Sequence, residues 1–170
     1  SNKSYNVSTV DKNNILKIAE NEKVDGVLAF GSDLSMLTCS YVTDKLNLPG
    51  NSYKSVESLV YKSKFRQALV ANGIQDCNYK TFGKKELNQL IEFISASDFL
   101  SVLKPVDGNG SKGVSIIDPR FNNEKKIKNA FDKSLSGKVI IEKFIKKKLP
   151  QICGDGFFQN GRLKFIYFGD

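Results

Sequence analysis

Apolar positions in the first fifty residues follow helical spacing, then strand spacing, then helical spacing again. Residues 15–19 begin an amphipathic pattern behind Asp11, whose carboxylate can accept hydrogen bonds from the free amides of a first helical turn. Residues 24–30 (VDGVLAF) are a short apolar run rich in strand formers, and a second helical pattern occupies residues 34–46. The pattern therefore predicts a helix, a strand and a helix, which together make one piece of an α/β layer.

A break at residues 48–51, which contains a proline and a glycine, separates this part from a longer series of elements. Helical spacing predicts helices over residues 55–73, 87–94 and 127–135, and apolar runs predict strands over residues 78–82, 99–104, 114–117 and 139–145. Near the end, Asn160-Gly161 separates two strand-like segments, which is a strong hairpin signal. The sequence thus predicts an α/β (α+β) protein, with residues 1–52 and 53–170 in different domains.

Composition removes several kinds of chemistry. The chain has no histidine, which excludes Ser-His-Asp and Cys-His nucleophiles and histidine zinc sites. Its three cysteines, Cys39, Cys77 and Cys153, are too few and too scattered for a disulfide framework or a tetrahedral metal site. No apolar run approaches the roughly 20 residues that span a bilayer, and the first residues lack a signal-peptide pattern. We therefore expect a cytoplasmic protein with no membrane partner.

Positive charge is the other marked feature of the composition. The chain has 26 lysines and arginines against 18 acidic residues, a formal net charge of +8, which raises nucleic acid as a partner. However, the one dense cluster is Lys146-Lys147-Lys148, and no zinc-finger spacing, RNP-type motif or basic zipper is present. A solvated lysine-rich surface therefore explains the charge better than a nucleic-acid site does.

Gly108, Gly110 and Gly113 satisfy the pattern G-x-G-x-x-G. A dinucleotide fingerprint needs a helix after the last glycine, but residues 114–117 read as a strand. A P-loop needs Ser or Thr after its lysine, but Lys112 is followed by Gly113. What remains is a glycine-rich hairpin whose backbone amides can approach phosphates, with Lys104 on the strand before it.

Four segments, in order, resemble the motifs of the ATP-grasp family. Residues 62–66 (KSKFR) with 71–74 (ANGI) resemble the helix that opens an ATP-grasp domain, and residues 102–105 with the loop 107–113 resemble its strand, lysine, proline and glycine-rich loop. Residues 139–145 are similar to the strand that leads into the adenine-binding hinge, and residues 151–163 to the paired strands that follow. Residues 11–50 resemble the end of the Rossmann-like domain that precedes the ATP-grasp region in carbamoyl-phosphate-synthetase-like members.

The resemblance implies an ATP site. Lys62 and Lys104 would reach the nucleotide phosphates, the loop backbone would cover them, and Glu142 with the main chain after it would read the adenine edge. Leu103, Ile141 and Phe144 would form the apolar slot for the base. The implied nucleotide-binding residues are Lys62, Lys104, Gly108, Asn109, Gly110, Ser111, Lys112, Gly113, Glu142, Lys143, Phe144 and Ile145.

The resemblance also implies a reaction, in which MgATP phosphorylates a carboxylate and an amine or similar nucleophile attacks the acyl phosphate. Positioning and charge neutralisation carry such a reaction, so no residue here is predicted to be catalytic. The family's acidic Mg²⁺ ligands would lie beyond residue 170, and no residue of this chain is predicted to bind metal. We accordingly expect a fragment cut at both ends, inactive by itself.

Simpler interpretations stay open for each feature. Lys104 can be a strand-end lysine whose ammonium group reaches water, and Glu142 can be a charge that protects an edge strand from aggregation. The chain as a whole can be a nucleotide-binding module without catalysis, or, less favoured, a basic nucleic-acid-binding domain.

Overall fold

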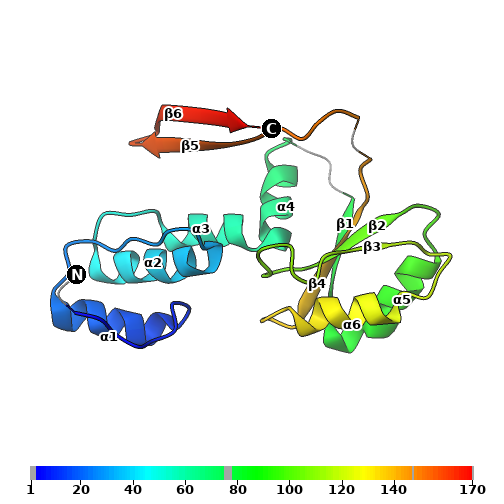
Figure 1. Ribbon diagram of the computed structural model, residues 1–170, viewed down its shortest axis with the longest axis horizontal. Helices are drawn as coiled ribbons and strands as arrows, with labels where there is room; N and C mark the ends of the chain where they lie inside the picture. Colours follow the sequence, from blue (N-terminus) through cyan, green and yellow to red (C-terminus); the bar gives the residue numbers. More distant parts are fainter. Residues whose placement is uncertain (1–2, 75–77, 147, 170) are drawn as a thin grey trace.

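The computed structural model describes residues 3–74, 78–146 and 148–169. Three helices form the N-terminal part: α1 (Lys12–Glu22), α2 (Asp33–Leu46) and α3 (Tyr53–Val60). Each begins at a side chain that accepts a hydrogen bond from a first-turn amide, namely Asp11, Ser32 and Ser52. The helices lie beside one another in chain order, away from the main sheet (Figure 1).

The strand predicted over residues 24–30 is wrong. This segment has no regular secondary structure, and the side chains of Leu28 and Phe30 are 88% and 96% exposed. One contact fixes the segment to α2, a hydrogen bond from the Cys39 thiol to the carbonyl of Val27. A strand needs a neighbour to pair with its amides and carbonyls, and no described strand pairs with this segment.

The helical stretch predicted over residues 55–73 is divided in two. The chain turns at Tyr61, whose ψ angle is 112°, and then starts α4 (Lys62–Ala71). The Lys62 amide donates to the Val106 carbonyl at 3.0 Å, which ties the start of α4 to the end of a strand in the main sheet. Gly73, at a φ angle of +64°, ends α4 as predicted.

A four-stranded antiparallel sheet forms the centre of the second part. Its strands are β1 (Tyr79–Gly83), β2 (Ser101–Pro105), β3 (Ser115–Ile117) and β4 (Lys138–Lys143), in the spatial order β1-β4-β2-β3. The 3₁₀ turn η1 (Lys84–Glu86) leads into α5 (Leu87–Ser95), and α6 (Glu124–Asp132) follows β3. The mixed helices and strands confirm the predicted α+β class.

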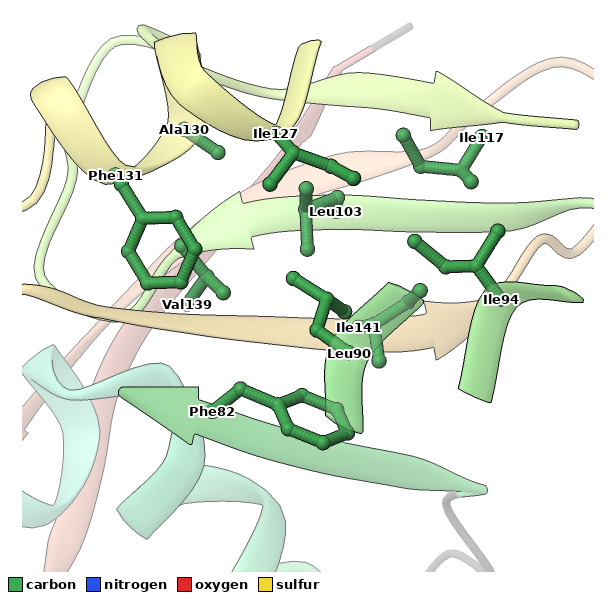
Figure 2. Close-up of a cluster of buried hydrophobic side chains, with 10 residues drawn as sticks. All are labelled: Phe82, Leu90, Ile94, Leu103, Ile117, Ile127, Ala130, Phe131, Val139 and Ile141. Atoms are coloured by element: carbon green, nitrogen blue, oxygen red, sulfur yellow. The ribbon is translucent and has the colours of Figure 1, made fainter. Parts of the chain in front are cut away.

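The pleat of the sheet gives β2 and β4 two different faces. Leu103 and Ile141 pair across the two strands and point toward α5 and α6, where they join the buried cluster that Figure 2 shows. Lys104 and Glu142 alternate with these residues, so they lie on the opposite face. One face therefore supplies the core, and the other supplies charged side chains.

The hairpin signal is confirmed in the last part of the chain. Asn160 and Gly161 have φ angles of 52° and 71° and connect β5 (Cys153–Gln159) to β6 (Arg162–Gly169). Every residue of the hairpin except Gly169 is exposed. The hairpin stands apart from the main sheet in Figure 1. Among the described residues, no helix is long and apolar enough to cross a bilayer. Cys77 and Lys147, named above, lie outside the described residues.

Candidate functional site

Lys62 lies where α4 approaches the glycine-rich loop. Its ammonium group donates to the carbonyl of Gly108 at 2.5 Å, 46 positions further along the chain. The sequence predicted that Lys62 and this loop belong to one site, and the fold does bring them together.

The loop itself is a pair of tight turns. Hydrogen bonds from Lys112 to the Asn109 carbonyl and from Val114 to the Ser111 carbonyl close them, and Gly110, Ser111 and Gly113 take positive φ angles. Asn109, Gly110, Ser111 and Lys112 are exposed at the tip, while Gly113 is buried. The tip therefore presents to solvent the backbone at Gly110, the short side chains of Asn109 and Ser111, and the longer side chain of Lys112.

Asp107 anchors the base of the loop. Its buried carboxylate accepts hydrogen bonds from the Ser134 hydroxyl at 2.9 Å and from the amides of Leu135 and Ser136. These bonds join the loop to the segment between α6 and β4, so the ends of the loop are held although its tip is exposed.

Lys104 is not a solvated strand-end lysine. Its ammonium group donates to Oε2 of Glu142 at 2.6 Å, and the same carboxylate accepts two bonds from Arg66 of α4. The side chains of Arg66, Glu142 and Lys104 are 23%, 12% and 22% exposed. Since Lys104 and Glu142 are diagonal neighbours on one face of paired strands, the register of β2 and β4 produces this contact.

The charges in this region favour an anion as ligand. Burial lowers the pKa of Lys62, and the neighbouring charge of Lys104 lowers it further. Burial alone would raise the pKa of Glu142, but hydrogen bonds from Arg66 and Lys104 hold that pKa below its ordinary value. Two cations, Arg66 and Lys104, therefore pair with one ionised carboxylate, and incoming negative charge would relieve the repulsion between Lys62 and Lys104.

The segment predicted to bind adenine, residues 143–145, follows Glu142 at the end of β4, which is an inner strand of the sheet. Because β4 lies between β1 and β2, the edge-strand explanation of Glu142 is wrong. The amide of Lys143 donates to the Asn78 carbonyl and the amide of Phe144 to the Leu100 carbonyl, so both amides serve the sheet. Lys143 and Ile145 are exposed, and Phe144 is half-buried.

The predicted apolar slot is partly wrong. Leu103 and Ile141 are 0% and 1% exposed, and they belong to the core beneath α5 and α6. They cannot meet a base bound beside Glu142, because successive residues of a strand point to opposite faces. The apolar neighbours on the Glu142 face are Val102 and Ile140, and the alternation in the strands could have shown this.

Sequence reasoning also missed Arg66. Its place four positions after Lys62 put both cations on one face of a helix, which was a usable signal. Its partner, Glu142, lies 76 positions away, and no local pattern links the two.

A magnesium ion needs oxygen ligands, which acidic side chains commonly supply. Among the residues that the structure describes, no group of three or more acidic, cysteine or histidine side chains could hold a metal ion. The described site therefore fits a phosphate-rich ligand and does not by itself fit the metal.

Part of a known enzyme chain is similar in sequence to this protein. A carbamoyl phosphate synthase large chain from Thermotoga petrophila is 27% identical over 147 residues. The match covers 84% of this chain, which spans 13% of the length of that relative. No protein-family model matches the chain.

Two solved structures superimpose well. The D-alanine–D-alanine ligase from Bacillus anthracis gives a TM-score of 0.61 at 22% identity and covers 89% of this chain and 56% of that one. The biotin carboxylase domain of 2-oxoglutarate carboxylase from Hydrogenobacter thermophilus, solved with MgADP and bicarbonate, gives 0.63 at 15% identity, with coverages of 81% and 32%. The chain has the ATP-grasp fold. The similarity to these two structures extends over most of the chain, because each of the two covers at least four-fifths of it.

Proposed function

We propose that this chain is the ATP-binding region of an ATP-grasp ligase. In such a ligase, ATP supplies the phosphoryl group that turns a carboxylate into an acyl phosphate, which an amine or similar nucleophile then attacks. The proposal assigns the carboxylate and the amine only as classes. It also assigns residues 1–52 to a preceding domain and residues 53–170 to the ATP-grasp region.

One observation carries the proposal: two lysines from separate elements meet at a glycine-rich loop. Lys62 on α4 bonds to the loop at Gly108, and Lys104 is the last residue but one of β2, the strand that leads into the loop. Both side chains are half-buried, and Lys62 lies close enough to Lys104 for their charges to repel, so the two lysines form a cationic site that a phosphate chain can neutralise.

Different residues of this chain would bind the phosphates and the adenine of the nucleotide. Lys62, Lys104 and the backbone of residues 108–113 would hold the phosphates, because the tip of the loop is exposed and contains Gly110, which allows close approach. Glu142 and the main chain of Lys143 to Ile145 would meet the adenine edge, through backbone groups other than the amides of Lys143 and Phe144, which donate to Asn78 and Leu100. The magnesium that accompanies ATP would need acidic ligands other than those described here.

A thermal-shift titration of the chain with MgATP, MgGTP and adenosine tests the proposal. At 100 times its dissociation constant a ligand stabilises a protein by about 2.7 kcal/mol, which gives a clear shift in Tm for a domain of this size. We expect MgATP to raise the Tm more than MgGTP does, and Lys104→Met to abolish the MgATP shift.

Lys125→Met is the matched control, because Lys125 is an exposed lysine on α6, which covers the other face of the sheet. It should leave the MgATP shift unchanged. Equal shifts with MgATP and MgGTP, or equal losses in the two variants, would contradict the proposal.

A nucleotide-binding module without catalysis would share this site and give the same titration. ATP-dependent turnover, measured as ADP release with candidate carboxylates and amines by the protein that contains this region, separates a ligase from such a module.

A further inference from the structure

The carboxylate of Glu142 is shared by two cations that hold it in different ways. Arg66 bonds to both oxygens, with Nε at 2.8 Å from Oε1 and Nη2 at 3.3 Å from Oε2. Lys104 bonds to Oε2 alone, at 2.6 Å. Lys104 and Arg66 therefore share Oε2, and the Lys104 bond to it is the shorter one.

A phosphate that binds Lys104 must take it from Glu142. An ammonium group has three donors on a flexible stem, so Lys104 can turn toward a phosphate that enters near the loop. The side chain of Glu142 is only 12% exposed, and a carboxylate left there without a cation would be strongly unfavourable. The exchange therefore depends on what remains bound to Glu142.

Arg66 is suited to remain. Its planar guanidinium already reaches both oxygens, and it can close into a two-bond fork once Lys104 leaves Oε2. With Arg66 in place, Glu142 stays neutralised in both arrangements. Without Arg66, Lys104 would be the one cation still bonded to the carboxylate among the residues that the structure describes, and it would be held there.

We propose that Arg66 is a positioning residue that frees Lys104 for the phosphates of a nucleoside triphosphate by keeping Glu142 paired. The inference rests on the proposed function, and it deepens that function by making nucleotide binding an exchange of partners at Glu142. Arg66 does not itself touch the nucleotide in this scheme.

A double-mutant cycle tests this role, with MgATP affinity measured by isothermal titration calorimetry on the whole chain. Arg66→Met is compared with the unaltered chain, and the pair Arg66→Met, Glu142→Gln with Glu142→Gln alone. We expect Arg66→Met to raise the Kd at least tenfold in the first background and less than twofold in the second, where no carboxylate holds Lys104. Each ratio is taken within one background, so any contact that Glu142→Gln removes from the adenine cancels.

Lys64→Met is the matched control, since it removes one positive charge from the same helix and Lys64 pairs with Glu57 instead. It should change the Kd less than twofold. Arg66→Lys provides a second test if Arg66→Met fails to fold: it keeps the charge but bonds one oxygen at a time, and we expect a loss of about threefold or more.

Two outcomes would overturn the role of Arg66 while leaving the proposed function intact. Equal losses in both backgrounds would mean that Arg66 acts on the phosphates through its own charge. If Arg66→Met and Arg66→Lys each raise the Kd for MgATP less than twofold in the unaltered background, Lys104 leaves Glu142 without the help of Arg66. Absence of MgATP binding by the unaltered chain would instead overturn the proposed function, and this role with it.

Discussion

At the scale of single residues, the sequence revealed the charges but not their pairing. Lys104 could be selected because it lies between an apolar strand and a glycine-rich loop, whereas Lys62 could be selected only through the resemblance of residues 62–66 to the first helix of an ATP-grasp domain. The spacing of four residues indicated that Arg66 lies beside Lys62, but its bond to Glu142 could not be predicted, because Glu142 lies far away in the chain. Leu103 and Ile141 were misplaced because the alternation of strand faces was not applied to residues next to Lys104 and Glu142.

The lowered pKa of Glu142 predicts a specific dependence of stability on pH. A carboxylate whose pKa is lower in the folded than in the unfolded state stabilises the fold above its unfolded pKa, and this contribution disappears as the pH falls through the folded value. We expect Glu142→Gln to lower the Tm at pH 7, and the difference from the unaltered chain to shrink between about pH 5 and pH 3.

Thermal melts at a series of pH values measure this difference. Glu92→Gln is the control, because Glu92 is exposed on α5, and its Tm should follow that of the unaltered chain. A difference for Glu142→Gln that stays constant down to pH 3 would show that its carboxylate charge does not stabilise the fold.

At the scale of elements, the glycine-rich loop is held at its base by one carboxylate. Asp107→Ala would remove the carboxylate that accepts three hydrogen bonds from the segment between α6 and β4. We expect a loss of about 1–3 kcal/mol in the free energy of unfolding, measured by urea denaturation. Asp25→Ala, at an exposed position, should change it by less than about 0.5 kcal/mol. If both variants lose the same amount, Asp107 does not anchor the loop.

Two glycines of this loop should respond differently to alanine. At Gly113 a methyl group would lie 2.8 Å from Cγ of Pro105 and 2.9 Å from Cβ of Lys133, at a φ angle of +76°. At Gly110 it would meet no atom within 4 Å, so only the φ angle of +56° is unfavourable. Urea denaturation should show a loss of about 2–4 kcal/mol for Gly113→Ala and about 1 kcal/mol for Gly110→Ala. The reverse order would show that packing against Pro105 does not decide the role of Gly113.

The boundaries of most elements followed from local signals, and the failures share one cause. Asp11, Gly73 and Asn160-Gly161 act within a few residues of the helix or strand that they limit, so their effects could be predicted. The strand at residues 24–30 and the single helix at residues 55–73 were wrong because contacts decide them: the first has no described partner, and the second divides where Lys62 meets Val106. Local pattern contains neither fact.

At the scale of the whole molecule, protection of the backbone should be uneven. Strands β2 and β4 pair on both sides over a buried core, whereas β5 and β6 pair only with each other, and a two-stranded hairpin by itself is marginally stable. Hydrogen exchange followed by NMR should give amides in the centres of β2 and β4 that exchange at least a hundred times more slowly than those of β5 and β6. Equal rates would mean that the hairpin has a stabilising partner.

The alternation of faces along β4 has a consequence for how this protein can change. Val139 and Ile141 maintain the folded state, while Glu142, on the other side of the same strand, arranges the cations. Natural selection would therefore act differently on neighbouring positions of β4. At one position it would act on the stability of the fold, and at the next on the binding of the ligand. Variation with a period of two along six residues would let the site diverge while its scaffold is conserved.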